Sequence, residues 1–295
     1  MNAHETPFSS SVRHLRRGLP SLLALSLLGS AIALHTAPAA VAPPLRVLLI
    51  TGGCCHDYAH QKDILKQGLE QRANVTVTQV HTADGSTKPP LAMLGNPDYA
   101  QGYDVVIHDE CAADINDPAL IKGLLTPHRA GIPGVNLHCA MHSFRIGNPG
   151  EKAAPGVERA LWFDYLGIQS SGHGAQLPIA IRFTETNHPI TQVLGDWTTI
   201  KEELYNNIQV GDTAKPLAQG TQTTKNKEGV AKDTQYVVAW VNDYQGTRVF
   251  STTIGHNNET VADARYLDLV TRGLLWACRK LDDHGAVLAG YGPKQ

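Results

Sequence analysis

The sequence has almost no excess of charge of either sign. Its 25 Lys and Arg residues stand against 27 Asp and Glu residues, a formal charge of −2 over 295 residues, so we expect no nucleic-acid or polyanion partner. It also lacks the Gly-x-Ser-x-Gly, P-loop, HExxH and dinucleotide-binding motifs, and we expect no nucleotide cofactor. No single motif therefore identifies the chemistry, and the distribution of polar residues over the fold has to do so.

Cysteines are few as well. Five cysteines cannot build a disulfide scaffold in a chain of this length, and an odd number leaves at least one thiol unpaired or paired between chains. Either Cys54 or Cys55 could pair with Cys111, because both segments follow predicted strands. Buried free thiols are the alternative.

The N-terminal segment has the composition of an export signal. Arg13, Arg16 and Arg17 precede a short apolar run at 22–34 and small residues at 37–42, which is typical of a secretory signal peptide. We expect residues 1–42 to be removed and residues 43–295 to form one exported domain, periplasmic or secreted and not integral to a membrane. An uncleaved anchor is the alternative, although the run is short for a span of about 20 residues. General and twin-arginine export both remain open.

Strand and helix patterns alternate through the first half of the chain. Apolar runs predict buried strands at 45–50, 74–80, 103–107 and 132–137, and apolar residues at helical spacing predict helices at 61–72 and after Pro118. This alternation favours a parallel sheet covered by helices.

The second half reads differently. Alternating segments predict strands at 176–183, 235–241 and 247–253, the last two joined by a hairpin turn. Residues 209–232 are polar and predict a surface excursion, and 261–281 predict a final helix that packs on the sheet.

The apolar run at 132–137 stops abruptly at His138. Small residues and a helix-compatible segment at 141–144 follow, so we predict a buried strand that turns sharply into a helix. Such a turn lies at the carboxyl ends of the strands, where ligands bind in doubly wound sheets. In a cysteine amidotransferase the nucleophile stands at the apex of such a turn, and here Cys139 comes one residue after that position. A cysteine hydrolase that uses Cys139 is one alternative function.

Several of the 14 histidines follow strands. His56, His138 and His256 each stand in the loop after a predicted strand, and His173 lies in a loop at 170–174. A single histidine is most often structural, but polar side chains at strand ends are where loop-built sites collect.

Two acidic segments could supply carboxylates to such a site. Asp109 and Glu110 end the third predicted strand, and Glu202 and Glu203 precede Tyr205 in a segment without a clear helical pattern. A carboxylate beside histidines can act as a base, an acid or a metal ligand.

Several of these segments, in this order, resemble the ThuA-like (trehalose-utilisation) family. They cover most of residues 45–281 and are 135–140 (VNLHCA), 171–174 (SGHG), 188–191 (HPIT), 202–205 (EELY), 238–241 (VAWV), 255–256 (GH) and 272–277 (RGLLWA). The resemblance implies an α/β, flavodoxin-like or class I glutamine amidotransferase-like three-layer sandwich, with a mostly parallel central sheet and antiparallel additions. It also implies a histidine where the amidotransferase nucleophile would stand.

The resemblance further implies a small carbohydrate ligand, and for some members the breakdown of 3-keto-glycosides made by partner sugar oxidoreductases. The matching positions imply catalytic roles for His138, His173, Glu203 and His256. We assign substrate binding to His56, Asp109 and Tyr205. Cys54-Cys55 and Asn136 depart from the family's usual residues and leave the substrate open.

The chemistry predicted from this set is acid–base cleavage of an oxidised glycoside by a hydrolase or lyase. A 3-keto group acidifies the neighbouring C–H, so a base of modest strength can remove that proton and expel the glycosidic oxygen, and histidine titrates near the working pH. Either His138 or Glu203 would be the base, and either His173 or His256 the acid.

A divalent metal, zinc or manganese, bound by His56, His138 and His173 could stabilise the enolate instead. The alternative outside enzymology is a non-catalytic periplasmic sugar-binding protein or a scaffold for a sugar oxidoreductase. Trp162 and Trp197 would then stack on sugar rings.

Overall fold

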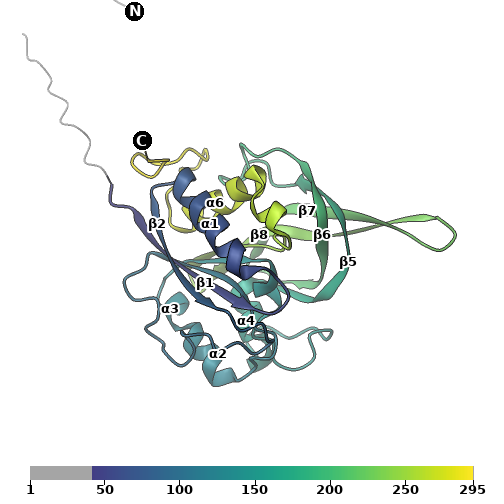
Figure 1. The fold of residues 1–295 in the computed structure, drawn as a ribbon, viewed down its shortest axis with the longest axis horizontal. Coiled ribbons are helices and arrows are strands. Elements are labelled where there is room, and N and C mark those ends of the chain that lie inside the picture. Colours follow the sequence, from purple (N-terminus) through teal and green to yellow (C-terminus); the bar gives the residue numbers. More distant parts are fainter. Residues whose placement is uncertain (1–41, 295) are drawn as a thin grey trace, which may run out of the picture. The chain divides into compact units, whose positions relative to one another are not determined.

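The computed structural model describes residues 42–294 and builds them around one nine-stranded sheet (Figure 1). The strand order is β2-β1-β3-β4-β9-β8-β7-β5-β6; the first five strands are parallel, and those from β8 to β6 add antiparallel pairings. The strands are β1 Leu45–Gly53, β2 Val75–Thr82, β3 Val105–Cys111, β4 Gly134–Leu137, β5 Ile168–Phe183, β6 Trp197–Val210, β7 Ala214–Lys225, β8 Ala231–Tyr244 and β9 Thr247–Thr252.

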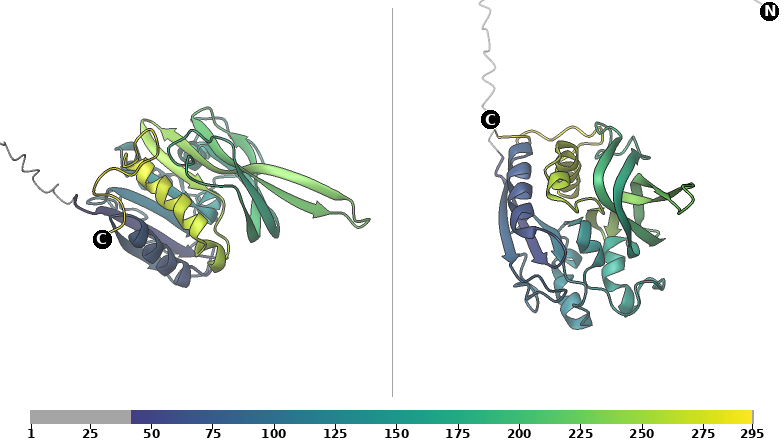
Figure 2. Two further views of the ribbon diagram at one scale, coloured as in Figure 1. Left: turned by 90° about the horizontal axis from the view of Figure 1, so that it is seen from above. Right: turned by 45° about the vertical axis from the view of Figure 1, so that its right-hand side comes forward.

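Helices cover both faces of the parallel half. Helices α1 (Tyr58–Arg72), α5 (Asn258–Val261) and α6 (Ala264–Ala277) lie on one face (Figure 2), and α2 (Pro118–Leu124), α3 (Thr126–Arg129) and α4 (Leu161–Leu166) on the other. Successive strand residues point to opposite faces, so Val47 and Leu49 join the first core while Leu48 and Ile50 join the second. The predicted three-layer α/β sandwich with a mixed sheet is confirmed.

The parallel half matches the predicted elements closely. Helix α2 begins where expected, at Pro118, and the Asp117 side chain caps it by accepting a hydrogen bond from the Ala119 N–H. The antiparallel half does not match as well. The loop predicted at 170–174 lies inside β5, β6 was not predicted, and the polar segment at 209–232 forms β7 and the start of β8. These last two strands form a hairpin that extends away from the body of the sheet (Figure 1).

The acidic pair at the end of the third strand is buried within β3 rather than in a loop. Glu110 Oε1 lies 2.8 Å from Nδ1 of His108. The other ring nitrogen of His108, Nε2, lies 3.1 Å from His128 Nε2. Burial, and then the neighbouring His108, lower the pKa of His128 to about 3. This network packs under α3 and α4, so Glu110 belongs to the core of that face.

The expected signal peptide falls almost entirely on residues outside the described range of 42–294. Within that range no helix is long and apolar enough to cross a membrane.

Candidate functional site

His138 lies at the predicted sharp turn from β4 into a helix, which is a short 3₁₀ helix (His138–His142). Its φ is +41°, a left-handed conformation that non-glycine residues rarely adopt and that recurs at functional sites. The Nδ1 atom lies 2.7 Å from the Thr253 carbonyl oxygen, which can only accept, so Nδ1 carries the proton. The Nε2 lone pair therefore faces Tyr205 Oη, 3.3 Å away.

Glu203, on β6, is surrounded by three imidazoles. Its Oε2 lies 3.5 Å from His138 Nε2 and 3.6 Å from His173 Nε2, and its Oε1 lies 3.4 Å from His256 Nδ1. These rings come from the turn after β4, from β5 and from the segment after β9. The structure thus brings together all four residues to which catalysis was assigned from the sequence.

The pairing of β5 with β6 sets much of this geometry. Its register places Gln176 opposite Glu203 and His173 opposite Tyr205. The Gln176 amide nitrogen donates to Glu203 Oε1 at 3.2 Å and lies 2.8 Å from His256 Nε2. Gln176 therefore holds the carboxylate and His256 in fixed relative positions.

The segment that carries His256 is held from two sides. The backbone N–H of His256 donates to both oxygens of the buried Glu202, at 3.0 and 3.2 Å. The backbone carbonyl of His256 accepts from the Gln61 side chain at 3.0 Å. The preceding Gly255 has a φ of +132°, and a Cβ there would lie 2.8 Å from Tyr266 Oη. Glycine is required for His256 to reach Glu203.

His56 completes the cluster from the loop after β1. Its ring centroid lies 4.6 Å from that of His138 and 4.8 Å from that of His256. Its buried Nδ1 has no hydrogen-bond partner among residues 42–294, and a buried polar atom normally has one. This nitrogen is free to bind a ligand.

Burial and neighbouring charges set opposite protonation states in the cluster. Burial works to raise the pKa of Glu203, but the neighbouring imidazoles of His138 and His256 outweigh it and hold the pKa well below its usual range. Glu203 in turn raises the pKa of His256. Burial, with repulsion from the other two rings, lowers the pKa of His56 to about 2. The site therefore contains a carboxylate, a histidine that is readily protonated and a neutral histidine.

His56, His173, Glu203, Tyr205 and His256 line a cavity of about 390 Å³. His138 is buried behind Tyr205 and Glu203 and is not one of the described residues that line it. The other described residues around it are Cys54, Cys55, Thr87, Cys111, Ala113, Cys139, His142, Arg145 and Gln176. The Nε and Nη1 atoms of Arg145 are buried without a partner in the described chain, so this guanidinium can donate to oxygens of a ligand.

Asp109, predicted to bind substrate, is not one of the described residues that line the cavity. It is buried and accepts a hydrogen bond from Thr51 Oγ1 at 3.3 Å. Burial, and then the adjacent Glu110, raise its pKa well above the usual range.

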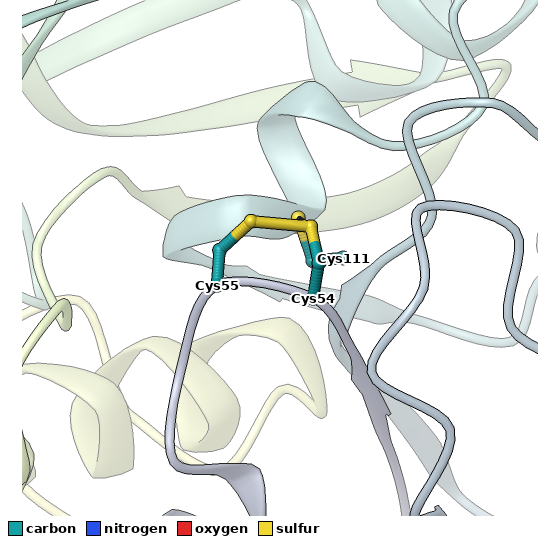
Figure 3. Close-up of side chains that lie close together, drawn as sticks. All are labelled: Cys54, Cys55 and Cys111. Carbon is teal, nitrogen blue, oxygen red and sulfur yellow. Dashed lines mark hydrogen bonds between the residues drawn. A yellow bond between two sulfur atoms is a disulfide. The ribbon is translucent and has the colours of Figure 1, made fainter.

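The cysteine pairing differs from the prediction. Cys111 pairs with Cys139, and Cys54 pairs with its neighbour Cys55 (Figure 3). With its sulfur in a disulfide, Cys139 is not an available nucleophile, and His138 occupies the apex of the turn. The geometry favours histidine chemistry over a cysteine hydrolase.

Three of the histidines have the arrangement of a metal site. The ligand nitrogens of His56, His138 and His256 all lie within 4.8 Å of one another. Two of these residues were predicted, but His256 takes the place that the prediction gave to His173. His173 is half-exposed, and its Nδ1 lies 2.9 Å from the Gly174 carbonyl.

The fold is a flavodoxin-like or class I glutamine amidotransferase-like three-layer sandwich, with His138 at the turn after β4. The family model for ThuA, described as trehalose utilisation, matches residues 46–277, and the chain belongs to that family.

Solved structures agree with this assignment of the fold. A ThuA-like protein from Parabacteroides merdae is 19% identical with a TM-score of 0.59, over 85% of this chain and 98% of that chain. One from Bacteroides uniformis is 15% identical with a TM-score of 0.55, over 82% and 95%. A search of curated proteins found no significant match.

Proposed function

We propose that this protein cleaves an oxidised, 3-keto glycoside by histidine acid–base chemistry. The observation that carries the proposal is Glu203, a buried carboxylate within 3.6 Å of three imidazoles, two of which, His173 and His256, line the same cavity as the carboxylate. Such a set provides both a base and an acid at one small site. Family membership supports a carbohydrate ligand, because the family is described by trehalose utilisation.

The protonation states assign the roles. The Nε2 lone pair of His138 takes the proton from the carbon beside the keto group. The electrons of that C–H bond form a C=C bond, and the C–O bond to the leaving sugar breaks. His256, whose pKa Glu203 raises, gives its proton to the departing oxygen. Addition of water to the product would complete a hydrolysis.

Arg145 and Tyr205 would position the sugar. Tyr205 is buried and directs its hydroxyl toward His138 Nε2, and the unpaired donors of Arg145 face the same cavity. Both groups can hydrogen-bond hydroxyl or carbonyl oxygens, which are what a sugar offers.

The direct test is turnover of 3-keto-disaccharides by the purified protein. We expect release of a free sugar from the keto form and none from the same disaccharide before oxidation, since only the keto group acidifies the C–H bond. Binding of both sugars without release from either would contradict the proposal and indicate a binding protein. Among the described residues no tryptophan lines the cavity, and Trp162, Trp197 and Trp240 are buried in the cores, so no stacking platform favours that alternative.

The three-histidine cluster fits a divalent metal, because three imidazoles and an open position suit zinc or manganese and the His56 Nδ1 lacks another partner. When bound, such an ion would polarise the keto oxygen. His56, His138 and His256 would hold it instead of acting as base and acid, and those two roles would then fall to Glu203 and His173.

If the cluster holds an ion, elemental analysis of the purified protein should find one zinc or manganese ion per chain, and chelation should lower the melting temperature, because a ligand bound only by the folded state stabilises it. His56→Ala should lose the ion, whereas His60→Ala, a neighbouring exposed histidine on α1, should keep it. Metal-free protein with full turnover would show that the imidazoles act without an ion.

We also propose that the protein is exported. The composition of residues 1–42 supports this, and the pairing of four cysteines in disulfides fits an oxidising compartment. Fractionation of cells that express the full chain, with sequencing of the mature N-terminus, tests it. Intact protein in the cytoplasm would contradict it.

A further inference from the structure

Four of the five cysteines form a continuous row of sulfur atoms beside the histidine cluster. Cys55 is bonded to Cys54, the Cys54 sulfur lies 3.5 Å from the Cys111 sulfur, and Cys111 is bonded to Cys139. Figure 3 shows the Cys54–Cys55 pair with Cys111 directly beside it. The row joins the loop after β1, the end of β3 and the turn after β4. The acid–base mechanism uses none of these sulfurs.

Access to the row is one-sided. Of the four residues only Cys55 is exposed; Cys54 is partly buried, and Cys111 and Cys139 are 3% and 6% exposed. Cys55 also has a φ of +81°, a strained conformation for a side-chain-bearing residue. An attacking thiol from solvent therefore reaches Cys55 first, and opening the Cys54–Cys55 ring lets that backbone relax.

We propose that these cysteines are a thiol–disulfide relay whose reducing substrate is a dithiol. A thiolate of the dithiol attacks Cys55 Sγ and forms a mixed disulfide, and Cys54 leaves as a thiolate. Cys54 then attacks Cys111 Sγ, 3.5 Å away, and Cys139 leaves as a thiolate. The second thiol of the dithiol resolves the mixed disulfide and releases Cys55.

The electrons and atoms balance in this sequence. The dithiol is oxidised to its disulfide, and the protein gains two electrons as two thiols, on Cys55 and Cys139, with one new disulfide between Cys54 and Cys111. One of the two thiols thus forms next to His138, while the other stays at the surface on Cys55. The Cys139 sulfur and a ring nitrogen of His56 lie within 4.8 Å of each other, so reduction places a thiol in the cavity of the histidine cluster.

The relay can be tested by mapping thiols, which does not depend on any activity toward sugars. The full chain with Cys278→Ser, which removes the remaining cysteine, is treated anaerobically with one equivalent of dithiothreitol, quenched with iodoacetamide and digested. We expect alkylation at Cys55 and Cys139 and a peptide cross-linked through Cys54 and Cys111. Alkylation of Cys54 and Cys55 with the Cys111–Cys139 link intact would overturn the relay. So would four free thiols in protein purified in air.

A second variant tests the central exchange without any reductant. In Cys55→Ser/Cys278→Ser, Cys54 is a thiol from the start and contacts Cys111, so we expect the Cys54–Cys111 link and a reactive thiol mainly at Cys139. The matched control, Cys54→Ser/Cys55→Ser/Cys278→Ser, should keep the Cys111–Cys139 link and show no reactive thiol. A reactive thiol that stays at Cys54 in the first variant would show that the sulfurs touch without exchanging.

Discussion

His138→Asn should lower kcat/KM for a 3-keto-disaccharide by about 10²–10⁴-fold, the usual contribution of a positioned general base, with little change in melting temperature. The Nε2 lone pair of His138 faces Tyr205 and Glu203, which line the cavity, because its Nδ1–H donates to the Thr253 carbonyl. Asparagine is preferred over alanine for the test because it tolerates the left-handed conformation that this position requires, with a φ of +41°. The substitution therefore removes the imidazole without adding backbone strain.

Steady-state kinetics and circular dichroism on the same samples decide the result. His60→Asn is the matched control, since His60 is exposed on α1 and contacts only Asp57 within the described hydrogen bonds. We expect it to leave both measurements unchanged. Wild-type kcat/KM in a folded His138→Asn protein would remove His138 from the chemistry and leave Glu203 as the base.

The parallel half of the sheet could be predicted because its strands are buried on both faces. Leu45–Ile50 and Val105–Ile107 are short apolar runs, and such runs are typical of parallel strands. Their order along the chain then places His56, His138 and His256 at one edge, since parallel strands end on the same side. This is why three site histidines could be found without any alignment.

The antiparallel half of the sheet was harder to predict because buried polar residues point to both faces of its strands. Residues 202–205 of β6 are all buried, yet Glu202 bonds the His256 backbone on one side while Glu203 meets the imidazoles on the other. Two adjacent buried carboxylates hide the alternation expected of a strand. In β5, Gly172 and Gly174 suggest a loop, but bulges in the pairing with β6 accommodate them.

Some site residues left no signal in the sequence. Gln176 matters because the register places it opposite Glu203, and Arg145 matters because its guanidinium reaches the cavity without a partner; neither fact follows from residue type. Asp109 shows the converse. Its position at the end of a predicted strand suggested a place in the site. However, β3 continues to Cys111, so the Asp109 side chain is buried beside Thr51.

Glu203→Gln should lower kcat/KM by roughly 10²–10⁴-fold, as expected when a carboxylate that supports a catalytic imidazole is removed, and should also change the pH profile. Glu203 raises the pKa of His256, so the neutral amide should lower it. If His256 donates the proton to the leaving oxygen, activity is lost as pH rises through that pKa. The descending limb of the profile should therefore move to lower pH in the variant, while the isosteric amide keeps the packing around Gln176.

Glu202→Gln is the matched comparison, because Glu202 is adjacent and buried but faces the His256 backbone rather than the imidazoles. It makes only the smallest of the contributions that raise the pKa of His256, so its descending limb should shift less than that of Glu203→Gln. Equal shifts in the two variants would mean that the general field of the carboxylates, and not the contact with Glu203, sets the protonation of His256. If Glu203→Gln lowers the activity at every pH but leaves the descending limb in place, the acid is His173. Within the described chain, His173 is the third imidazole within 3.6 Å of that carboxylate, after His138 and His256.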